Sequence, residues 1–318
     1  MSAERFNSDL FLTTSEVADL LDVHASTVKR WCNEGDLAFD KTSGGHRRIH
    51  LNDVLGLARA REIPTFLQGF SPYEGHVWTA VSEVVETGSF ERTLSLAMGW
   101  LMRGKTERVA QLFLELGRHP QVPFELFCDE GIRGFMVEVG NAWRAGQLRV
   151  GEEHMLTETL IEVLLQLRHQ LPTHPSAHTN GVSPRPIAVV GAMEGDRHTL
   201  GGLCIRMELE RMGWKVFFLG ADVPVEDFSA MQRARDAALV CVSFAPPRTG
   251  ADMQRCVRIL AEFYDPDAPF ALALGGHAAH EADFLDMDTP FAALGTFVSV
   301  TDFHEALVGG FGSVRSAK

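Results

Sequence analysis

The strongest constraint on the fold of this chain is a regular alternation in its C-terminal part. Short apolar runs typical of buried strands occupy residues 187–192, 215–219, 238–244, 270–274 and 291–294. Stretches with helical periodicity follow them at residues 199–212, 225–237, 252–263, 279–284 and 302–308. Successive strand–helix units predict a Rossmann-like α/β domain with a parallel, doubly wound sheet over residues 187–318. Ligands of such sheets bind beyond the carboxyl ends of the strands.

The residues before this domain have a different organisation. Residues 171–186, LPTHPSAHTNGVSPRP, contain four prolines and no periodicity, which indicates a linker. Residues 74–170 show repeated helical periodicity and no strand pattern. Helices of this length joined by short loops predict an antiparallel four-helix bundle. One of these helices is expected from about residue 124 to 145, with Gly146 as its C-cap.

Residues 1–70 carry the signals of a third kind of domain. Thr13 and Glu16 form a capping-box pattern before a first short helix, and a second helix is expected over residues 25–33. The glycine pair in TSGGHRR is a hairpin turn signal. Helix, tight turn, helix and glycine-tipped hairpin, in this order, predict a winged helix-turn-helix domain.

The positions of basic residues in this domain suggest contacts with DNA. Lys29 and Arg30 lie on the exposed face of the second predicted helix, which would enter the major groove. His46, Arg47 and Arg48 follow the hairpin turn and would reach phosphates or the minor groove. A small helical domain with a basic loop is the alternative. The stretches STVKRWCNEGDL and TSGGHRRIHLNDV resemble the MerR-type DNA-binding domain, which implies dimeric binding to operator DNA with repeated or palindromic half-sites.

Composition excludes several classes of protein. The formal charge of −13 argues against indiscriminate coating of nucleic acid, so any DNA contact must come from a local patch. The five scattered cysteines form no CxxC pair, which argues for reduced thiols and against a zinc site. The longest apolar stretch, residues 237–245, is too short to span a bilayer, and MSAERFNSDL does not have the pattern of a signal peptide. We therefore expect a cytoplasmic protein without a membrane partner, and the absence of a catalytic dyad argues against an enzyme.

Polar and small residues gather where the predicted strands end. The first strand is followed by GAMEGDRHTLG, the third ends in Ser-Phe-Ala and the fourth ends in Gly-Gly-His. The first loop does not match the GxGxxG pattern of nicotinamide-binding folds. The three loops resemble instead the cobalamin-binding Rossmann-like domain shared by methionine synthase and the corrinoid mutases. The residues that carry this resemblance are Asp196, His198, Gly201, Ser243, Gly275 and Gly276.

The resemblance implies a role for each of these residues. His198 would bind cobalt as the lower ligand in place of the cofactor's own dimethylbenzimidazole. Asp196 would accept a hydrogen bond from the other ring nitrogen and fix the tautomer. The glycines would leave room for the displaced nucleotide tail, and Ser243 would hydrogen-bond its base. Ala245 is smaller than the residue usual in the serine motif, and the gap to Gly275 is slightly long. A solvated loop histidine is the plain alternative.

A second set of residues lies in the predicted bundle. Trp143 falls near the end of one helix, and Glu153 and His154 fall in the first turn of the next. Taken singly, a helix-end Trp is usually a core residue, and a Glu at a helix start often compensates the dipole. Together they match the Trp-x9-Glu-His motif of the light-sensing cobalamin regulators of the CarH group. That resemblance covers nearly the whole chain, from winged helix to cobalamin domain.

Resemblance to the CarH group implies a mechanism. Adenosylcobalamin would bind in the dark, with Trp143, Glu153 and His154 enclosing the 5′-deoxyadenosyl group. The apoprotein would be a monomer and the loaded form a tetramer that holds operator DNA and represses transcription. Light would break the cobalt–carbon bond, the bundle would move against the cobalamin domain, and the tetramer would dissociate.

One residue departs from the pattern of this group. In the best-known members a histidine follows the motif Trp and binds cobalt after photolysis, whereas Arg144 stands here. A guanidinium stays protonated and cannot ligate cobalt. His154, water or no stable adduct could replace that histidine. The signal could therefore be cobalamin level, a bilin chromophore as in the photocobilins, or a protein partner. A corrinoid shuttle protein of a methyltransferase system is a further alternative, against which the predicted wing argues.

Overall fold

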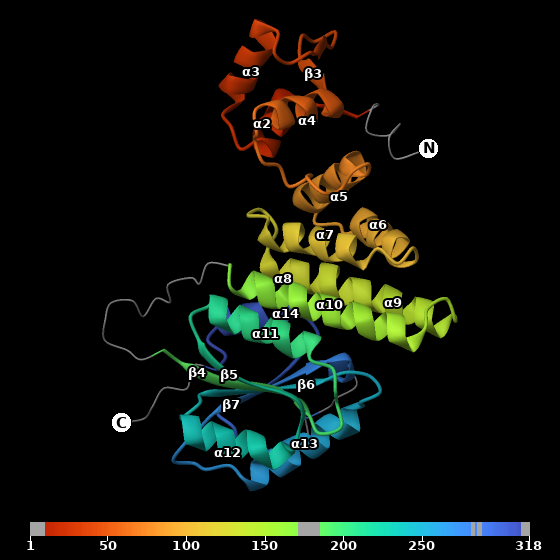
Figure 1. Ribbon diagram of the computed structural model, residues 1–318. Coiled ribbons are helices and arrows are strands. Elements are labelled where there is room, and N and C mark those ends of the chain that lie inside the picture. Colours follow the sequence, from red (N-terminus) through yellow and green to blue (C-terminus); the bar gives the residue numbers. More distant parts are fainter. Residues whose placement is uncertain (1–9, 171–184, 281–283, 285–287, 313–318) are drawn as a thin grey trace. The chain divides into compact units, whose positions relative to one another are not determined.

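The computed structural model describes residues 10–170, 185–280, 284 and 288–312 (Figure 1). Internal contacts divide the chain into two compact units, Met1–Leu116 and Gly117–Lys318. This division falls inside the helical segment predicted over residues 74–170, so the domain boundaries drawn from the sequence stay predictions. The predicted linker lies almost wholly outside the described residues.

The first unit begins with a small antiparallel sheet and three helices. Its strands, in the order β1-β3-β2, are β1 (Phe11–Leu12), β2 (Asp40–Lys41) and β3 (Arg47–His50). Its helices are α2 (Thr14–Leu20), α3 (Ala25–Glu34) and α4 (Leu51–Ala60). The capping box is confirmed, because Glu16 N–H donates to Thr13 Oγ1 over 3.3 Å and Thr13 N–H donates to the Glu16 carboxylate over 2.6 Å. The helix-turn-helix with a hairpin wing is therefore present.

This unit also contains α5 (Glu74–Thr87), α6 (Glu91–Leu101) and all but the last two residues of α7 (Thr106–Arg118). The segment that precedes α5 is held by Arg108 of α7. The Arg108 guanidinium donates to the carbonyl oxygens of Phe70 and Ser71 over 3.2 and 2.7 Å. It also lies over the rings of Tyr73 and Trp100. The connection between the DNA-binding fold and these helices is thus an ordered, packed segment.

The second unit opens with helices α8 (Phe124–Leu126), η1 (Phe127–Arg133), α9 (Gly134–Arg144) and α10 (Val150–Arg168). The sequence predicts one α-helix from 124 to 145, but residues 127–133 form a π-helical segment within that run. The C-cap is Ala145 rather than Gly146, which follows it with φ +70°. The predicted C-cap was therefore one residue late.

The sheet of this unit has the predicted parallel, doubly wound form. Its strands are β4 (Ile187–Met193), β5 (Lys215–Val223), β6 (Leu239–Phe244), β7 (Ala271–Gly276) and β8 (Ala293–Phe297), in the order β5-β4-β6-β7-β8. Its helices are α11 (Leu200–Arg211), α12 (Val225–Arg235), α13 (Gly250–Glu262), the 3₁₀ helix η2 (His277–His280) and α14 (Val300–Val308). Together with the helix-turn-helix and the helical segment, this sheet confirms the multidomain fold class.

Two predicted elements were wrong in detail. The last strand begins two residues later than expected, because β8 is a half-buried edge strand that a fully apolar run does not mark. The α-helix expected over residues 279–284 is replaced, in its described part, by the 3₁₀ turn η2.

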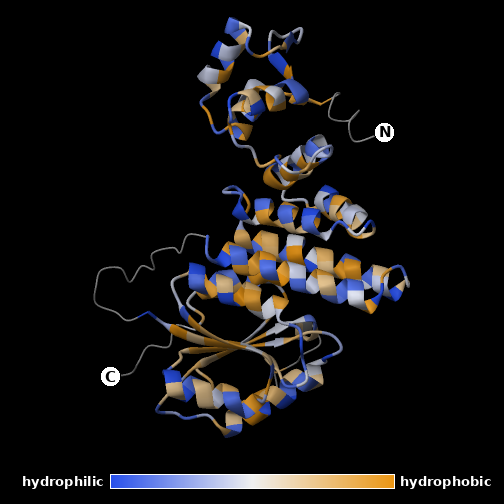
Figure 2. Ribbon diagram, in the orientation of Figure 1, coloured by the Kyte–Doolittle hydropathy of each residue, from blue (hydrophilic) through white to orange (hydrophobic). Residues whose placement is uncertain are grey.

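Helices cover both faces of the sheet. In Figure 1, α11 and α14 lie on one face, and α12 and α13 lie on the other. Alternate residues of β4 serve the two apolar cores, with Val189 facing α12 and α13 and Val190 facing α11 and α14. Figure 2 shows the strands largely orange and the flanking helices part orange and part blue. Among the described helices, none is long and apolar enough to cross a membrane.

Candidate functional site

The loops after β4 and β6 diverge at the point where the strand order reverses. After β4 the chain crosses to β5 on one side, and it later returns to place β6 on the other side. Such a switch point is where open α/β sheets bind ligands. Asp196 joins the two loops here, because its Oδ2 accepts a hydrogen bond from Ala245 N–H over 2.6 Å.

Asp196 also fixes His198, as the sequence predicts. Its Oδ1 lies 2.8 Å from His198 Nδ1 and accepts from His198 N–H over 3.0 Å. The carboxylate is buried, whereas the imidazole is 60% exposed. Within the described residues, His198 Nε2 has no hydrogen-bond partner. A neutral His198 would therefore carry its proton on Nδ1 and present the lone pair of Nε2 outward, as a metal ligand must.

The electrostatics of the pair agree with this geometry. The hydrogen bond to Asp196 raises the pKa of His198, and partial burial opposes this effect. The charges of Asp196 and Glu153 raise the pKa of His198 further. Burial alone would raise the pKa of Asp196, but the hydrogen bonds from His198 and Ala245 outweigh it and lower that pKa. An ionised carboxylate thus faces the ring.

The other residues of the predicted motifs lie around this pair. Ser243 Oγ is buried without a hydrogen-bond partner among the described residues, which is costly unless a ligand supplies one. A Cβ atom at Gly201 would meet nothing within 4 Å, so space is open there. Gly276 has φ +116°, and a Cβ would lie 2.2 Å from Phe244 O. Position 276 therefore requires glycine, because β6 passes too close for a Cβ atom. A Cβ atom at Gly275 would make only an ordinary van der Waals contact with Phe297 O.

The hairpin between α9 and α10 carries the second predicted set. Trp143 is 48% exposed. Glu153 accepts a hydrogen bond from Thr157 Oγ1 over 2.9 Å and lies 3.5 Å from His154 Nε2. The negative charge of Glu153 contributes to the raised pKa of His198. Within the described residues, no hydrogen bond or ring contact joins Trp143 or His154 to His198.

The Arg144 side chain forms hydrogen bonds with residues of its own helix, α9. Its guanidinium donates to Asn141 Oδ1 over 2.6 Å and to Gly140 O over 3.4 Å. The side chain is exposed, so this position offers a fixed cation beside Trp143 and not a metal ligand.

The side chains predicted to contact DNA differ in their exposure to solvent. Lys29, Arg30, His46 and Arg48 are exposed. Arg47 is half-buried: it donates to Asn33 Oδ1 of α3 over 2.8 Å, and its guanidinium lies 5.1 Å from the centroid of the Phe39 ring. It therefore ties the wing to α3, and the sequence gives no signal for this role. Contact with phosphate stays a prediction for all five.

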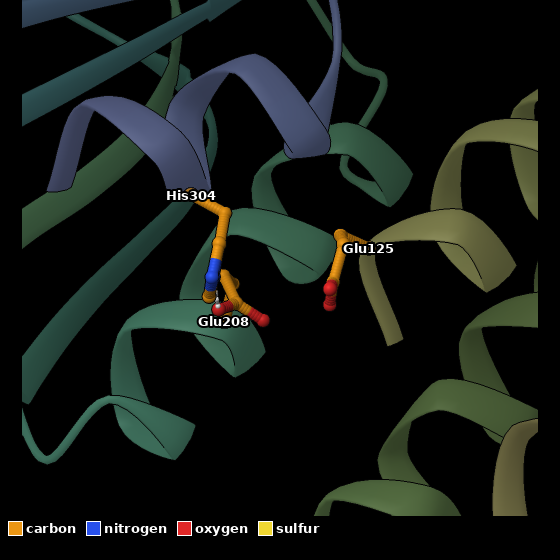
Figure 3. A group of neighbouring side chains, drawn as sticks. All are labelled: Glu125, Glu208 and His304. Atoms are coloured by element: carbon orange, nitrogen blue, oxygen red, sulfur yellow. Dashed lines mark hydrogen bonds and ion pairs between the residues drawn. The ribbon is translucent and has the colours of Figure 1, made fainter. Parts of the chain in front are cut away.

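The structure also shows a polar cluster that the sequence does not reveal. Figure 3 shows Glu125 of α8 pointing toward Glu208 of α11 and His304 of α14. His304 Nδ1 lies 2.7 Å from Glu208 Oε1, and one ligand-type atom from each of the three residues lies within 4.8 Å of the others. Arg211 already supplies a cation, since its Nη1 is 2.8 Å from Glu208 Oε2 and 3.6 Å from Glu125 Oε2. We therefore assign this helix-junction cluster a structural role.

Two family models match parts of the chain. Residues 11–62 match a family described as a helix-turn-helix domain, and residues 99–168 match one described as a B12 binding domain. The second match contains Trp143, Glu153 and His154.

Curated relatives include two repressors from Myxococcus xanthus. The chain is 27% identical to the HTH-type transcriptional repressor CarH over 162 residues, 50% of each chain. It is 27% identical to the repressor CarA over 157 residues, 49% of each chain. The chain thus matches about half the length of these relatives. Dimethylamine corrinoid protein 3 of Methanosarcina acetivorans is 25% identical over 45% of this chain and 64% of that one.

One solved structure shares the fold. The monomethylamine corrinoid protein of Methanosarcina barkeri aligns with a TM-score of 0.50 at 15% identity, over 67% of this chain and 95% of that one. A B12-binding domain indicates a cobalamin cofactor. The predicted resemblance is therefore confirmed: this chain carries a helix-turn-helix domain and a B12-binding domain, the combination of CarH-type cobalamin-binding regulators.

Proposed function

We propose that this protein is an adenosylcobalamin-dependent, light-sensing transcriptional repressor. Its loaded form in the dark is a tetramer that binds operator DNA, and light-driven loss of the adenosyl group releases the DNA. The observation that carries the proposal is the hydrogen-bonded Asp196–His198 pair at the switch point of the sheet.

The residues present fit such a cofactor. His198 offers an accessible ring nitrogen, and Asp196 holds its other nitrogen. Gly201 borders open space. The buried Ser243 hydroxyl has no hydrogen-bond partner among the described residues, and a nucleotide tail would supply one. Trp143, Glu153 and His154 would enclose the group on the other side of the metal. When bound, the cofactor supplies a cobalt–carbon bond that light breaks.

Assembly would then control DNA affinity. The exposed residues predicted to contact DNA from one winged domain, Lys29, Arg30, His46 and Arg48, are few, so a single domain would bind weakly. Linking several copies raises the effective concentration of each further domain at the operator. Dissociation of the tetramer therefore lowers affinity without any change in the DNA-binding surface.

The experiment uses the full chain loaded with adenosylcobalamin in the dark. Absorbance, size-exclusion elution and operator retention are measured before and after green light. We expect a changed spectrum, a smaller particle and free DNA after illumination. A methylcobalamin-loaded sample is the matched control for the adenosyl group. An unchanged spectrum together with an unchanged particle size would contradict the proposal.

Arg144 favours a second candidate function, a regulator of the same architecture with another signal. Its guanidinium is bound to Asn141 and Gly140 and cannot replace the lost upper ligand. Cobalamin level, a bilin or a protein partner would then control assembly. Two results together would favour this candidate. The wild-type protein would assemble with cobalamin and stay assembled in light, and the Arg144→His variant would dissociate in light. The similarity to corrinoid proteins suggests a third role, that of a methyl carrier. The helix-turn-helix domain argues against it.

A further inference from the structure

The loop that carries His198 is exposed, yet it must hold Asp196 buried. Glu194, Gly195, Arg197 and His198 are all exposed, and Asp196 alone points inward. An exposed loop of this kind keeps one conformation only if neighbouring elements bind its backbone. The bond from Ala245 N–H holds the Asp196 side chain from the β6 side.

Asp222, near the end of β5, binds the same loop from the opposite side. Its Oδ1 accepts a hydrogen bond from Gly195 N–H over 2.7 Å. Its own N–H donates to Asp196 O over 2.8 Å. Two hydrogen bonds in opposite directions therefore join one residue of β5 to the two residues that precede Arg197 and His198.

The path of β5 explains how Asp222 reaches the loop. Val190 pairs with Phe218 and Met193 pairs with Val223, so β5 uses five residue steps where β4 uses three. Such irregularities bend a strand and redirect its side chains. Asp222 has φ +56°, in the left-handed region that Asp tolerates better than most residues.

We propose that Asp222 is a positioning residue for the cobalt ligand, acting through Gly195 and Asp196 to hold His198 at the carboxyl edge of the sheet. The inference rests on the proposed function, because it assigns Asp222 a role in ligation by His198. Among the described residues, no hydrogen bond or ion pair joins the Asp222 side chain to His198. It acts on the backbone that carries the Asp196–His198 pair.

Three variants separate the carboxylate from the backbone conformation. Asp222→Gly keeps the positive φ accessible and removes the acceptor, and Asp222→Asn retains an acceptor oxygen at the same place. Asp236→Gly is the matched control, because Asp236 also has a positive φ, at the end of α12, and has no bond to the loop. Circular dichroism checks that each variant folds.

The first measurement needs no cofactor. Hydrogen exchange at Gly195 N–H in the full-length apoprotein reports its bond to Asp222. We expect exchange to be faster by about tenfold or more in Asp222→Gly, the size typical of losing a hydrogen bond to a charged group. Asp222→Asn and Asp236→Gly should exchange like the wild type. Equal exchange in Asp222→Gly and the wild type would overturn the inference.

The second measurement reads ligation by spectroscopy. Cobalamin-loaded protein is reduced to Co(II), and nitrogen splitting from ¹⁵N-labelled histidine gives the histidine-ligated fraction. We expect the ratio of ligated to unligated cobalamin to fall by about 10- to 100-fold in Asp222→Gly, as for residues that orient metal ligands. Asp222→Asn should restore it, and an unchanged ratio in Asp222→Gly overturns the positioning role. If the wild-type protein shows no histidine ligation, the proposed function is contradicted instead. Hydrogen exchange at Gly195 N–H then decides alone whether Asp222 holds the loop.

Discussion

Two carboxylate–histidine pairs in the described part of the second unit have the same geometry and differ in their surroundings. Asp196–His198 and Glu208–His304 have O···Nδ1 distances of 2.8 and 2.7 Å, and in both the carboxylate side chain is 1% exposed. The second oxygen of Asp196 accepts a backbone N–H, whereas that of Glu208 binds the Arg211 guanidinium. The partner of the second oxygen therefore distinguishes the pair that we propose as a metal-ligand pair from the pair that joins helices.

The place of each pair in the fold accounts for this difference. Helix α11 begins two residues after His198 and carries Glu208 further along. Its first end lies at the ligand-binding edge of the sheet, and its later turns pack against α10 and α14. A histidine at the edge faces open space, while His304 faces protein side chains.

The largest expected effect is that of His198→Ala. Loss of the ring should abolish histidine ligation of bound cobalamin, as seen in the absorbance and Co(II) spectra of the loaded protein. Stability of the apoprotein should fall by only about 1 kcal/mol, because the buried Asp196 carboxylate loses one hydrogen bond and keeps those from the backbone N–H groups of His198 and Ala245. His154→Ala, on the hairpin, is the control that should retain lower ligation. Persisting histidine ligation in His198→Ala would show that the ligand is another residue.

Glu208→Ala should act on stability instead. Removing this carboxylate leaves Arg211 and His304 without their buried partner, which costs about 3–5 kcal/mol when one member of a buried pair is lost. Urea denaturation of the apoprotein measures it. Glu125→Ala, at the more exposed end of the cluster, should cost less than about 1 kcal/mol. Equal losses for the two variants would mean that Glu208 is not the centre of the cluster.

Asp196→Asn should weaken ligation while the fold is kept. The amide preserves the volume and can still accept the Ala245 N–H, but it removes the negative charge beside His198. We expect affinity for the histidine-ligated form to fall by about 10- to 100-fold, measured by titration with cobalamin. The corresponding change Glu208→Gln should leave that affinity unchanged. A fall of equal size in both variants would remove the distinction between the pairs.

Sequence reasoning predicts the sheet-edge pair and misses the helix-junction cluster for physical reasons. Buried parallel strands are continuous apolar runs, so β4, β6 and β7 are readable, and the residues that follow them must meet at one edge. Asp196 and His198 are two positions apart, so their contact is local. Glu208 and His304 are brought together only by the packing of α11 on α14.

Asp222 could not be predicted for a related reason. Its contact with Gly195 depends on two extra residues in the pairing of β5 with β4. Hydrophobic patterns report which face of a strand is buried, but they do not report such irregularities. The π-helical segment at 127–133 is equally invisible to them, although its Asp129 accepts hydrogen bonds from Val300 N–H and Thr301 N–H at the start of α14.

The smallest expected effect concerns a carboxylate of α11 whose hydrogen-bond partners, in the described part of the chain, are arginines. Glu210 accepts hydrogen bonds from Arg168 of α10 over 2.5 and 2.8 Å and from Arg206 over 3.1 Å. Burial alone would raise its pKa, but these bonds outweigh it and hold the pKa of Glu210 below its usual 4.5. Its contribution to stability is therefore complete above about pH 4.5 and is lost as the pH falls through the lowered value.

Glu210→Gln should lower the free energy of unfolding at neutral pH by no more than about 1 kcal/mol, because the side chains of this group are partly exposed. The variant should also lose less of its unfolding free energy than the wild type as the pH falls, measured from urea midpoints between about pH 3 and 7. Between pH 6 and 8 the difference between variant and wild type should stay constant, since neither glutamate nor arginine titrates there. A difference that changes across pH 6 to 8 would show that a histidine contributes. In that case the arginine-bound carboxylate would not be independent of the pair that Glu208, on the same helix, forms with His304 of α14.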